Sequence, residues 1–197
     1  MRNFHFVATA FLIALPMAQA KEYKVDPSHS NIGFTIRHLV SKVSGEFKDV
    51  EATLQFDVAK PSDAKLTASV KAGSINTNNE KRDNHLKSAD FFDVEKFPAL
   101  TFESKKISAA GRGKYKMTGD LTIHGTTKPV TFDVEYLGEA NDPWGMTRAG
   151  FTGSTKVNRK DFGMSWNKAL DQGGVLLGEE VTINLNIEGI LQGAEKK

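Results

Sequence analysis

The sequence predicts an all-β protein built from an antiparallel sheet. Apolar residues recur at every second position in runs that begin near residue 21 and continue almost to the end of the chain, and turn residues separate many of these runs. One helix-like stretch interrupts them. Strands with a single apolar face have to bury that face. The sheet is therefore expected either to pack under a cover or to close on itself.

The alternation predicts about eight strands. It is cleanest over 130–136 and 181–187, where Val, Phe, Tyr, Ile and Leu alternate with Thr, Asp, Glu and Asn. This pattern is typical of antiparallel strands with one face on the core. The remaining runs cover 32–36, 52–58, 66–70, 100–102, 115–117, 121–123 and 149–157.

Turn chemistry supports short sequential connections. Segments 109–113, 117–120 and 124–129 contain Gly or Pro and fall between alternating runs, where a hairpin needs such residues. Phe47 is out of step with Leu54 and Phe56. This change of phase predicts one long strand from Val43 to Val58 with a β-bulge near Asp49, the kind of bent strand found in barrels.

The helix-like stretch begins with the capping-box pattern Thr77-Asn78-Asn79-Glu80, which predicts a short helix with Thr77 as its N-cap. Three- and four-residue spacing then places several residues on one helical face. These residues are Arg82, His85, Leu86 and Ala89. An aromatic cluster of Phe91, Phe92 and Phe97 follows, and the whole insertion has the pattern of a lid over the open end of a barrel.

The N-terminus has the pattern of a cleaved signal peptide over residues 1–20. Arg2 supplies the positive start, 4–15 is mostly apolar, and Ala18-Gln19-Ala20 is a small-x-small cleavage site. The apolar run is shorter than the roughly 20 residues that a membrane span requires. We expect export to a periplasm without a stable membrane anchor. Residues 21–197 are long enough for one domain with a sizeable core.

Composition disfavours several function classes. The chain has a net charge of +2 with dispersed charges, which argues against a nucleic-acid partner. It has no Cys, and the histidines after the signal peptide lack the helical spacing of a metal site. Segment 163–167 lacks the second Gly of a nucleophile elbow. The sequence predicts no metal, no cofactor and no catalytic residue.

The interior of such a barrel has two interpretations that the pattern alone does not separate. Eight strands enclose a space that side chains fill completely or that holds one slender ligand. Five strand phenylalanines fit either case. They are Phe34, Phe56, Phe102, Phe132 and Phe151.

Several motifs resemble those of the YceI-like family of polyisoprenoid-binding proteins. The most specific is Arg82–Asp93, followed by Phe97-Pro98 and 101–104. Others are 26–30, 34–39, 45–47, 119–130 and 159–164, so the resemblance extends over most of the chain after the signal peptide. It implies an eight-stranded antiparallel lipocalin-like barrel, with the helix as a short lid insertion and an isoprenoid or similar long-chain lipid in the lumen.

The resemblance implies a non-enzymatic periplasmic carrier for a polyprenyl phosphate or quinone type of lipid. Two alternatives stay open: an enzyme acting on an apolar isoprenoid-like substrate in the same tunnel, and a stress-related protein-interaction module. The oligomeric state is also open, a homodimer included. Apolar residues expected to contact the ligand are Phe34, Ile36, Phe47, Leu54, Phe56, Phe91, Phe92, Phe102, Phe132, Phe151, Ile183 and Leu185. Polar candidates near the rim for a head group are Arg37, His38, Arg82 and His85, with Arg159 and Lys160 beside them.

Overall fold

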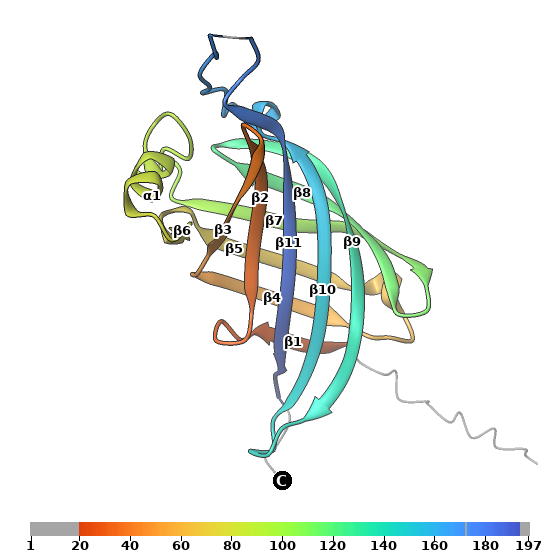
Figure 1. Cartoon of the computed structure of the whole chain (residues 1–197). Helices are drawn as coiled ribbons and strands as arrows, with labels where there is room; N and C mark the ends of the chain where they lie inside the picture. Colours follow the sequence, from red (N-terminus) through yellow and green to blue (C-terminus); the bar gives the residue numbers. More distant parts are fainter. Residues whose placement is uncertain (1–19, 172, 194–197) are drawn as a thin grey trace, which may run out of the picture.

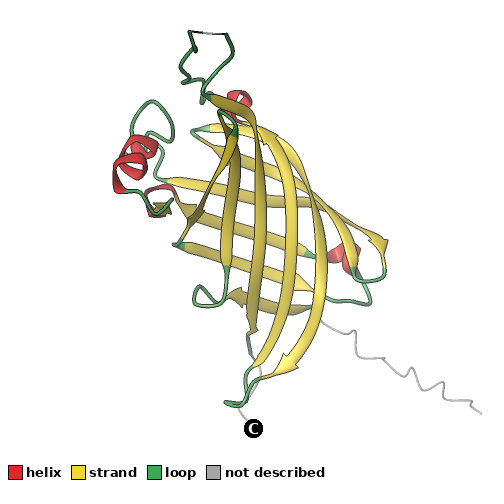
Figure 2. Cartoon of the chain, in the orientation of Figure 1, coloured by secondary structure: helices red, strands yellow, loops and turns green. Residues whose placement is uncertain are grey.

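The computed structural model describes residues 20–171 and 173–193, so the predicted signal peptide lies almost entirely outside the described residues. Eleven strands dominate the fold (Figures 1 and 2). The strands are β1 (Lys21–Val25), β2 (Asn31–His38), β3 (Ser41–Phe47), β4 (Val50–Phe56), β5 (Lys65–Lys71), β6 (Ile75–Asn76), β7 (Ala99–Gly111), β8 (Lys114–Ile123), β9 (Thr126–Asn141), β10 (Thr147–Asn158) and β11 (Leu177–Leu191). The helical segments are α1 (Glu80–Lys87) and the 3-10 turns η1 (Pro61–Asp63), η2 (Ala72–Ser74) and η3 (Arg159–Phe162).

Eight of these strands form a closed antiparallel barrel. Their order is β1-β4-β5-β7-β8-β9-β10-β11, and β1 pairs back onto β11 to complete the ring. β8 shows why these sequences form such a sheet, since every second residue from Tyr115 to Ile123 is buried, while the residues between them, from Lys116 to Thr122, are more exposed. The predicted eight-stranded antiparallel barrel is confirmed.

The long strand β11 pairs with β10 along one edge and with two strands, β1 and β2, along the other. Its last residues pair with β1, whereas the stretch 177–186 pairs with β2, which continues the sheet through β3 to β6. The barrel therefore carries a branch of three strands on one side, and α1 stands next to β6 in that region (Figure 1). No helix among the described residues has the length and apolar character needed to cross a bilayer.

The predicted long strand with a bulge near Asp49 is wrong. The chain turns a corner at Lys48 and Asp49, where Ser74 Oγ accepts hydrogen bonds from both backbone N–H groups. β3 before the corner pairs with β2 and β6, and β4 after it pairs with β1 and β5. The change of phase at Phe47 marks a change of neighbouring strands.

The predicted turn at 117–120 is also wrong, because β8 continues through it without a break. A Cβ atom at Gly119 would lie 2.5 Å from the ring of Phe102 on the neighbouring strand β7. Gly119 is therefore placed where an aromatic ring lies directly against the backbone, and no turn is needed to explain it.

The helix forms where it was predicted but begins two residues later. Its N-cap is Asn79, whose side chain accepts a hydrogen bond from the backbone N–H of Arg82. Thr77 instead donates its hydroxyl to Asp83 and accepts from Arg82 Nε, which fixes the helix to the strand before it. α1 ends at Lys87, so Ala89 lies beyond it and is exposed.

An ion network joins the strands next to the barrel closure. Arg148 on β10 contacts Asp26 at 2.6 Å, Glu188 at 2.5 Å and Asp142 at 2.8 Å, with only 16 % of its side chain exposed. Asp26 and Glu188 lie with His29 in a compact group of potential metal ligands, but their carboxylates already pair with the guanidinium. This network fixes the loop after β1 against β10 and β11.

Replacement of Arg148 by Met should lower the melting temperature by roughly 5 °C, because three carboxylates would lose their shared partner close to the seam. Lys105→Met is the matched control. Its ion pairs with Glu103 and Asp120 are exposed, and its melting temperature should stay within about 1 °C of the wild-type value. Equal shifts of the melting temperature in the two variants, measured by circular dichroism, would contradict the stabilising role of the Arg148 network.

The same network predicts an acid-sensitive stability. Hydrogen bonds from Arg148 and then His29 lower the pKa of Asp26 from 3.8 to about 2 in the folded protein. A lowered folded-state pKa stabilises the protein above the unfolded-state pKa, and this contribution disappears as the pH falls from about 4 to about 2. The difference in unfolding free energy between wild type and Asp26→Asn should therefore shrink over this range in urea titrations. A difference in unfolding free energy that does not change with pH would contradict this role of Asp26.

Candidate functional site

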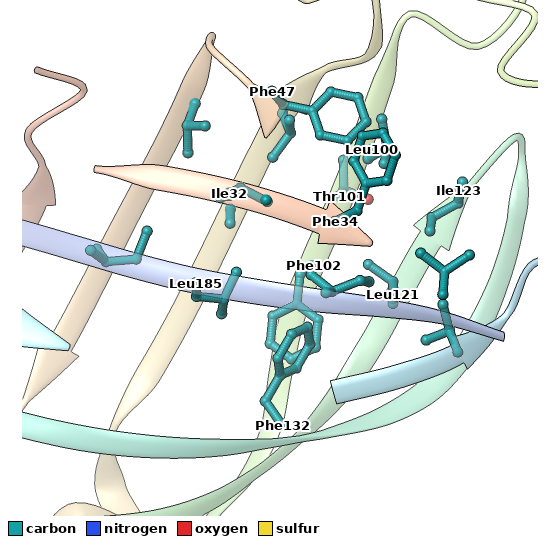
Figure 3. Close-up of a pocket in the computed structure, with 18 of the residues that line it drawn as sticks. Ile32, Phe34, Phe47, Leu100, Thr101, Phe102, Leu121, Ile123, Phe132 and Leu185 are labelled. Atoms are coloured by element: carbon teal, nitrogen blue, oxygen red, sulfur yellow. The ribbon is translucent and has the colours of Figure 1, made fainter. Parts of the chain in front are cut away.

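The barrel encloses an apolar cavity of about 380 Å³ (Figure 3). This volume lies in the range typical of small-molecule sites. Strands on all sides contribute to its wall, among them β2, β7, β8 and β11 with Phe34, Leu100, Leu121 and Leu185. Native side chains therefore do not fill the bore completely.

One end of the bore is closed by an aromatic floor that consists of Phe56, Tyr115, Tyr136 and Phe151. The ring of Phe56 lies 5.3–5.7 Å from each of the other three, and its contacts with Tyr115 and Phe151 are edge-to-face. Such contacts are favourable beyond the apolar area that they bury. The floor bounds this end of the cavity with mutually packed aromatic rings.

Further aromatic pairs line the bore above the floor. Phe102 and Phe132 meet edge-to-face with ring centres 5.3 Å apart, and they lie beside Leu185 and Leu121 in Figure 3. Nearer α1, the ring of Phe34 rests on Gly45, where a Cβ atom would come within 2.6 Å of it. Phe102 and Phe132 pack against each other and Phe34 packs against Phe47, and all of these rings also line the remaining space.

The other end, called the mouth below, is framed by α1, the segment after α1, the end of β2 and the loop before β11. His85 on α1 meets Trp166 from the loop with ring centres 4.9 Å apart, and Phe91 contacts both rings. All three residues line the cavity. The predicted lid is present as an aromatic bridge between α1 and the loop.

Basic side chains gather at the mouth. Arg82 donates to the Oγ1 and carbonyl oxygen of Thr77 at 2.7 and 2.8 Å, and His85 Nε2 lies 2.8 Å from Asp90. Arg159 in η3 is almost completely buried, and burial lowers the pKa of its guanidinium. These residues and His38 line the cavity, whereas no Asp or Glu of the described ranges does so.

The structure brings nearly all the predicted site residues to this one cavity. Every apolar candidate from Phe34 to Leu185 lines it, as do His38, Arg82 and His85. Arg37 and Lys160 do not: Arg37 is exposed at the end of β2, and Lys160 is exposed in η3, where it pairs with Glu179. Because Ile36 lines the cavity, strand alternation directs the side chain of Arg37 to the outer face.

Sequence reasoning missed part of the wall and the role of one tryptophan. Leu100, Leu121 and Ile123 line the cavity, and strand alternation alone would have placed them there. In the sequence, Trp144 and Trp166 lie in loop-like segments, where either could cover a barrel mouth or pack structurally, and packing was the preferred interpretation. Trp144 is 76 % exposed, while Trp166 lies at the mouth, a position that only the folded loop defines.

The arrangement suits retention of one elongated apolar molecule with a polar end. The wall offers dispersion and burial over most of its length, and nitrogen donors are confined to the mouth. Each buried methylene group contributes about 0.8 kcal/mol, so affinity grows with the length of the apolar chain that enters.

Comparisons with known proteins agree with this geometry. The model of the YceI-like domain matches residues 23–189. The chain belongs to the YceI-like family.

Relatives and solved structures cover most of the chain. A UPF0312 protein of Photorhabdus laumondii is 41 % identical over 186 residues, which is 93 % of each chain. The crystal structure of Burkholderia cenocepacia BcnA is similar with a TM-score of 0.73 at 26 % identity, over 83 % of this chain and 98 % of BcnA. A polyisoprenoid binding domain from Saccharophagus degradans shares the fold, with a TM-score of 0.60, 12 % identity, and coverage of 86 % and 98 %.

Occupation of the cavity should be visible in the fluorescence of Trp166. In the Trp144→Phe variant Trp166 is the single tryptophan, and an apolar ligand beneath it should shift its emission to shorter wavelength by excluding water. The complementary Trp166→Phe variant, which keeps only the exposed Trp144, should not respond. A response from Trp144 alone would argue against ligand entry below this lid.

Proposed function

We propose that this protein is a periplasmic binding protein for a long isoprenoid lipid, which it carries in the barrel lumen without chemical change. The observation that supports the proposal most is the continuous apolar cavity, closed by the aromatic floor and covered at the mouth by the bridge of His85, Phe91 and Trp166. Its ligand would be of the polyprenyl phosphate or quinone type.

The ligand class is supported by the shape of the bore and by similarity to known proteins. A slender, branched chain fits a bore that is bounded on all sides by strands and narrowed by rings such as Phe102 and Phe132. The family resemblance implies polyisoprenoid binding, and the Saccharophagus degradans domain is described as polyisoprenoid binding. The predicted signal peptide supports the periplasmic location.

Carriage fits the cavity wall better than catalysis does. General acid–base chemistry needs a positioned donor and acceptor at the reacting atoms. The wall below the mouth is made almost wholly of aliphatic and aromatic side chains, which bind by burial and offer no such pair. The histidine within the lid, His85, is held by Asp90 and packed between aromatic rings.

Native mass spectrometry of protein purified from its source should detect a co-purified isoprenoid lipid. Ala68→Trp should reduce lipid occupancy at least about tenfold. Ala68 lines the cavity beside Phe102, its neighbour on the adjacent strand, and an indole there would occupy the bore. Thr67→Trp is the matched control, since Thr67 is exposed on the same strand. Its occupancy should equal that of the wild type.

A protein that is reproducibly empty and also refuses added polyprenyl phosphate and quinone would refute the proposal. Chemical conversion of the lipid during long incubation would instead favour the enzymatic alternative. Circular dichroism and urea unfolding of both tryptophan variants separate a blocked bore from a damaged fold.

A further inference from the structure

Arg159 is an unusual buried cation at the mouth of the cavity. It follows β10 in η3, is 3 % exposed and lines the cavity. Its Nε donates to the carbonyl oxygen of Gly178 at 2.9 Å, and Nη1 donates to that of Met164 at 2.5 Å. The remaining nitrogen, Nη2, is buried and has no hydrogen-bond partner among the residues that the structure describes.

The charge of Arg159 has no carboxylate partner in the described part of the chain. Glu179 is the acidic group that acts on it electrostatically, but the Glu179 carboxylate pairs with Lys160 Nζ at 2.5 Å and accepts from Asn158. Arg148, in contrast, has three carboxylates around it. A buried guanidinium stays protonated, and a buried charge without a counter-charge is costly.

The two ends of the barrel differ in electrostatic character. Arg82, His38 and His85 accompany Arg159 around the mouth, and all four residues line the cavity. Beyond the aromatic floor lies Glu139, whose carboxylate accepts from Tyr23 and Lys21; these hydrogen bonds lower its pKa, so it is ionised. Because Glu139 forms an ion pair with Lys21, Lys21 is not a free cation at the floor end, and an anion in the bore is attracted to the mouth end.

We propose that Arg159 binds the oxyanion head group of the lipid through its free Nη2, so that the carried molecule is a polyprenyl phosphate rather than a neutral quinone or alcohol. The inference rests on the proposed function and adds the head-group chemistry to it. The head group lies at the mouth beside η3 and the loop before β11, and the chain extends toward the aromatic floor. Charge-assisted hydrogen bonds are strong in such water-poor surroundings.

The test compares two ligands that differ only in the head group, geranylgeranyl phosphate and geranylgeraniol. Binding is measured on delipidated full-length mature protein from the emission of Trp166 or by displacement of an apolar fluorescent probe. The wild type should bind the phosphate about 10- to 100-fold more tightly than the alcohol, as expected for a charge-assisted hydrogen bond. Equal affinities in the wild type would overturn the proposal without recourse to any variant.

Arg159→Met should lose this preference while its affinity for geranylgeraniol stays within about threefold of the wild-type value, since Met retains apolar volume at the site. Arg159→Lys keeps the charge and should retain part of the preference. Arg37→Met is the matched control, because Arg37 is exposed near Gly178 and does not line the cavity. Its preference should equal that of the wild type. Retention of the full preference by Arg159→Met would overturn the proposal.

Two further outcomes separate this inference from the function on which it rests. Binding of neither prenyl compound would refute the carrier function and this inference with it, whereas equal binding of both leaves the carrier function intact and overturns only the role of Arg159. Inorganic phosphate at millimolar concentration should not displace geranylgeranyl phosphate. Displacement that disappears in Arg159→Met would identify free phosphate as the ligand of Arg159 and overturn the lipid assignment.

Discussion

Closure of the sheet is the constraint on which the rest of this structure depends. A barrel wall that is apolar on its inner face would expose that face and two unpaired strand edges if β1 did not pair with the last residues of β11. β1 is only five residues long, and three of these residues, 23–25, pair with β11 at this seam. The neighbouring network of Arg148, Asp26 and Glu188 stabilises the short seam from the side. The cavity exists only because the ring is complete.

Closure also explains why β11 is long and why the helix lies where it does. The part of β11 that does not reach β1 pairs with β2, so the sheet divides into the ring and the branch of β2, β3 and β6. The division leaves one end of the barrel without a continuous wall. α1 and the loop with Trp166 cover this end through ring contacts instead of a hydrogen-bonded ladder. Side-chain contacts separate more readily than a ladder, which makes this end the natural entrance.

Local sequence was sufficient for the strands and for most of the cavity wall. Alternation identifies which residues share a face, and on a closed barrel one of the two faces is always the lumen. The same rule, applied consistently, would have rejected Arg37, because its neighbour Ile36 belongs to the inner face. The alternation thus contained more information about the site than the prediction used.

What the sequence could not supply are features that depend on which strands become neighbours. The phase change at Phe47 has two possible causes: one strand can bend, or the chain can move from one neighbouring strand to another. The sequence does not separate them, so the corner at Asp49 was interpreted as a bulge. Gly119 is consistent with a turn until the ring of Phe102 on the adjacent strand is known to lie against it. Thr77 and Asn79 both have N-cap chemistry, and the hydrogen bonds of Thr77 to Arg82 and Asp83 decide between them.

The space that side chains leave in the bore and the buried Nη2 of Arg159, which has no partner among the described residues, are two costs of the same kind. An unfilled apolar space forgoes dispersion contacts, and a buried donor without an acceptor has lost its water without replacement. Natural cores normally avoid both, yet here they occur in one cavity whose wall is otherwise well packed with rings. A single amphiphilic molecule of the proposed kind would remove both costs at once, because its chain would fill the space and its head group would accept from Nη2. Under the proposed function, lipid binding would complete the packing of this barrel, and the free energy gained by this packing would form part of the affinity for the lipid.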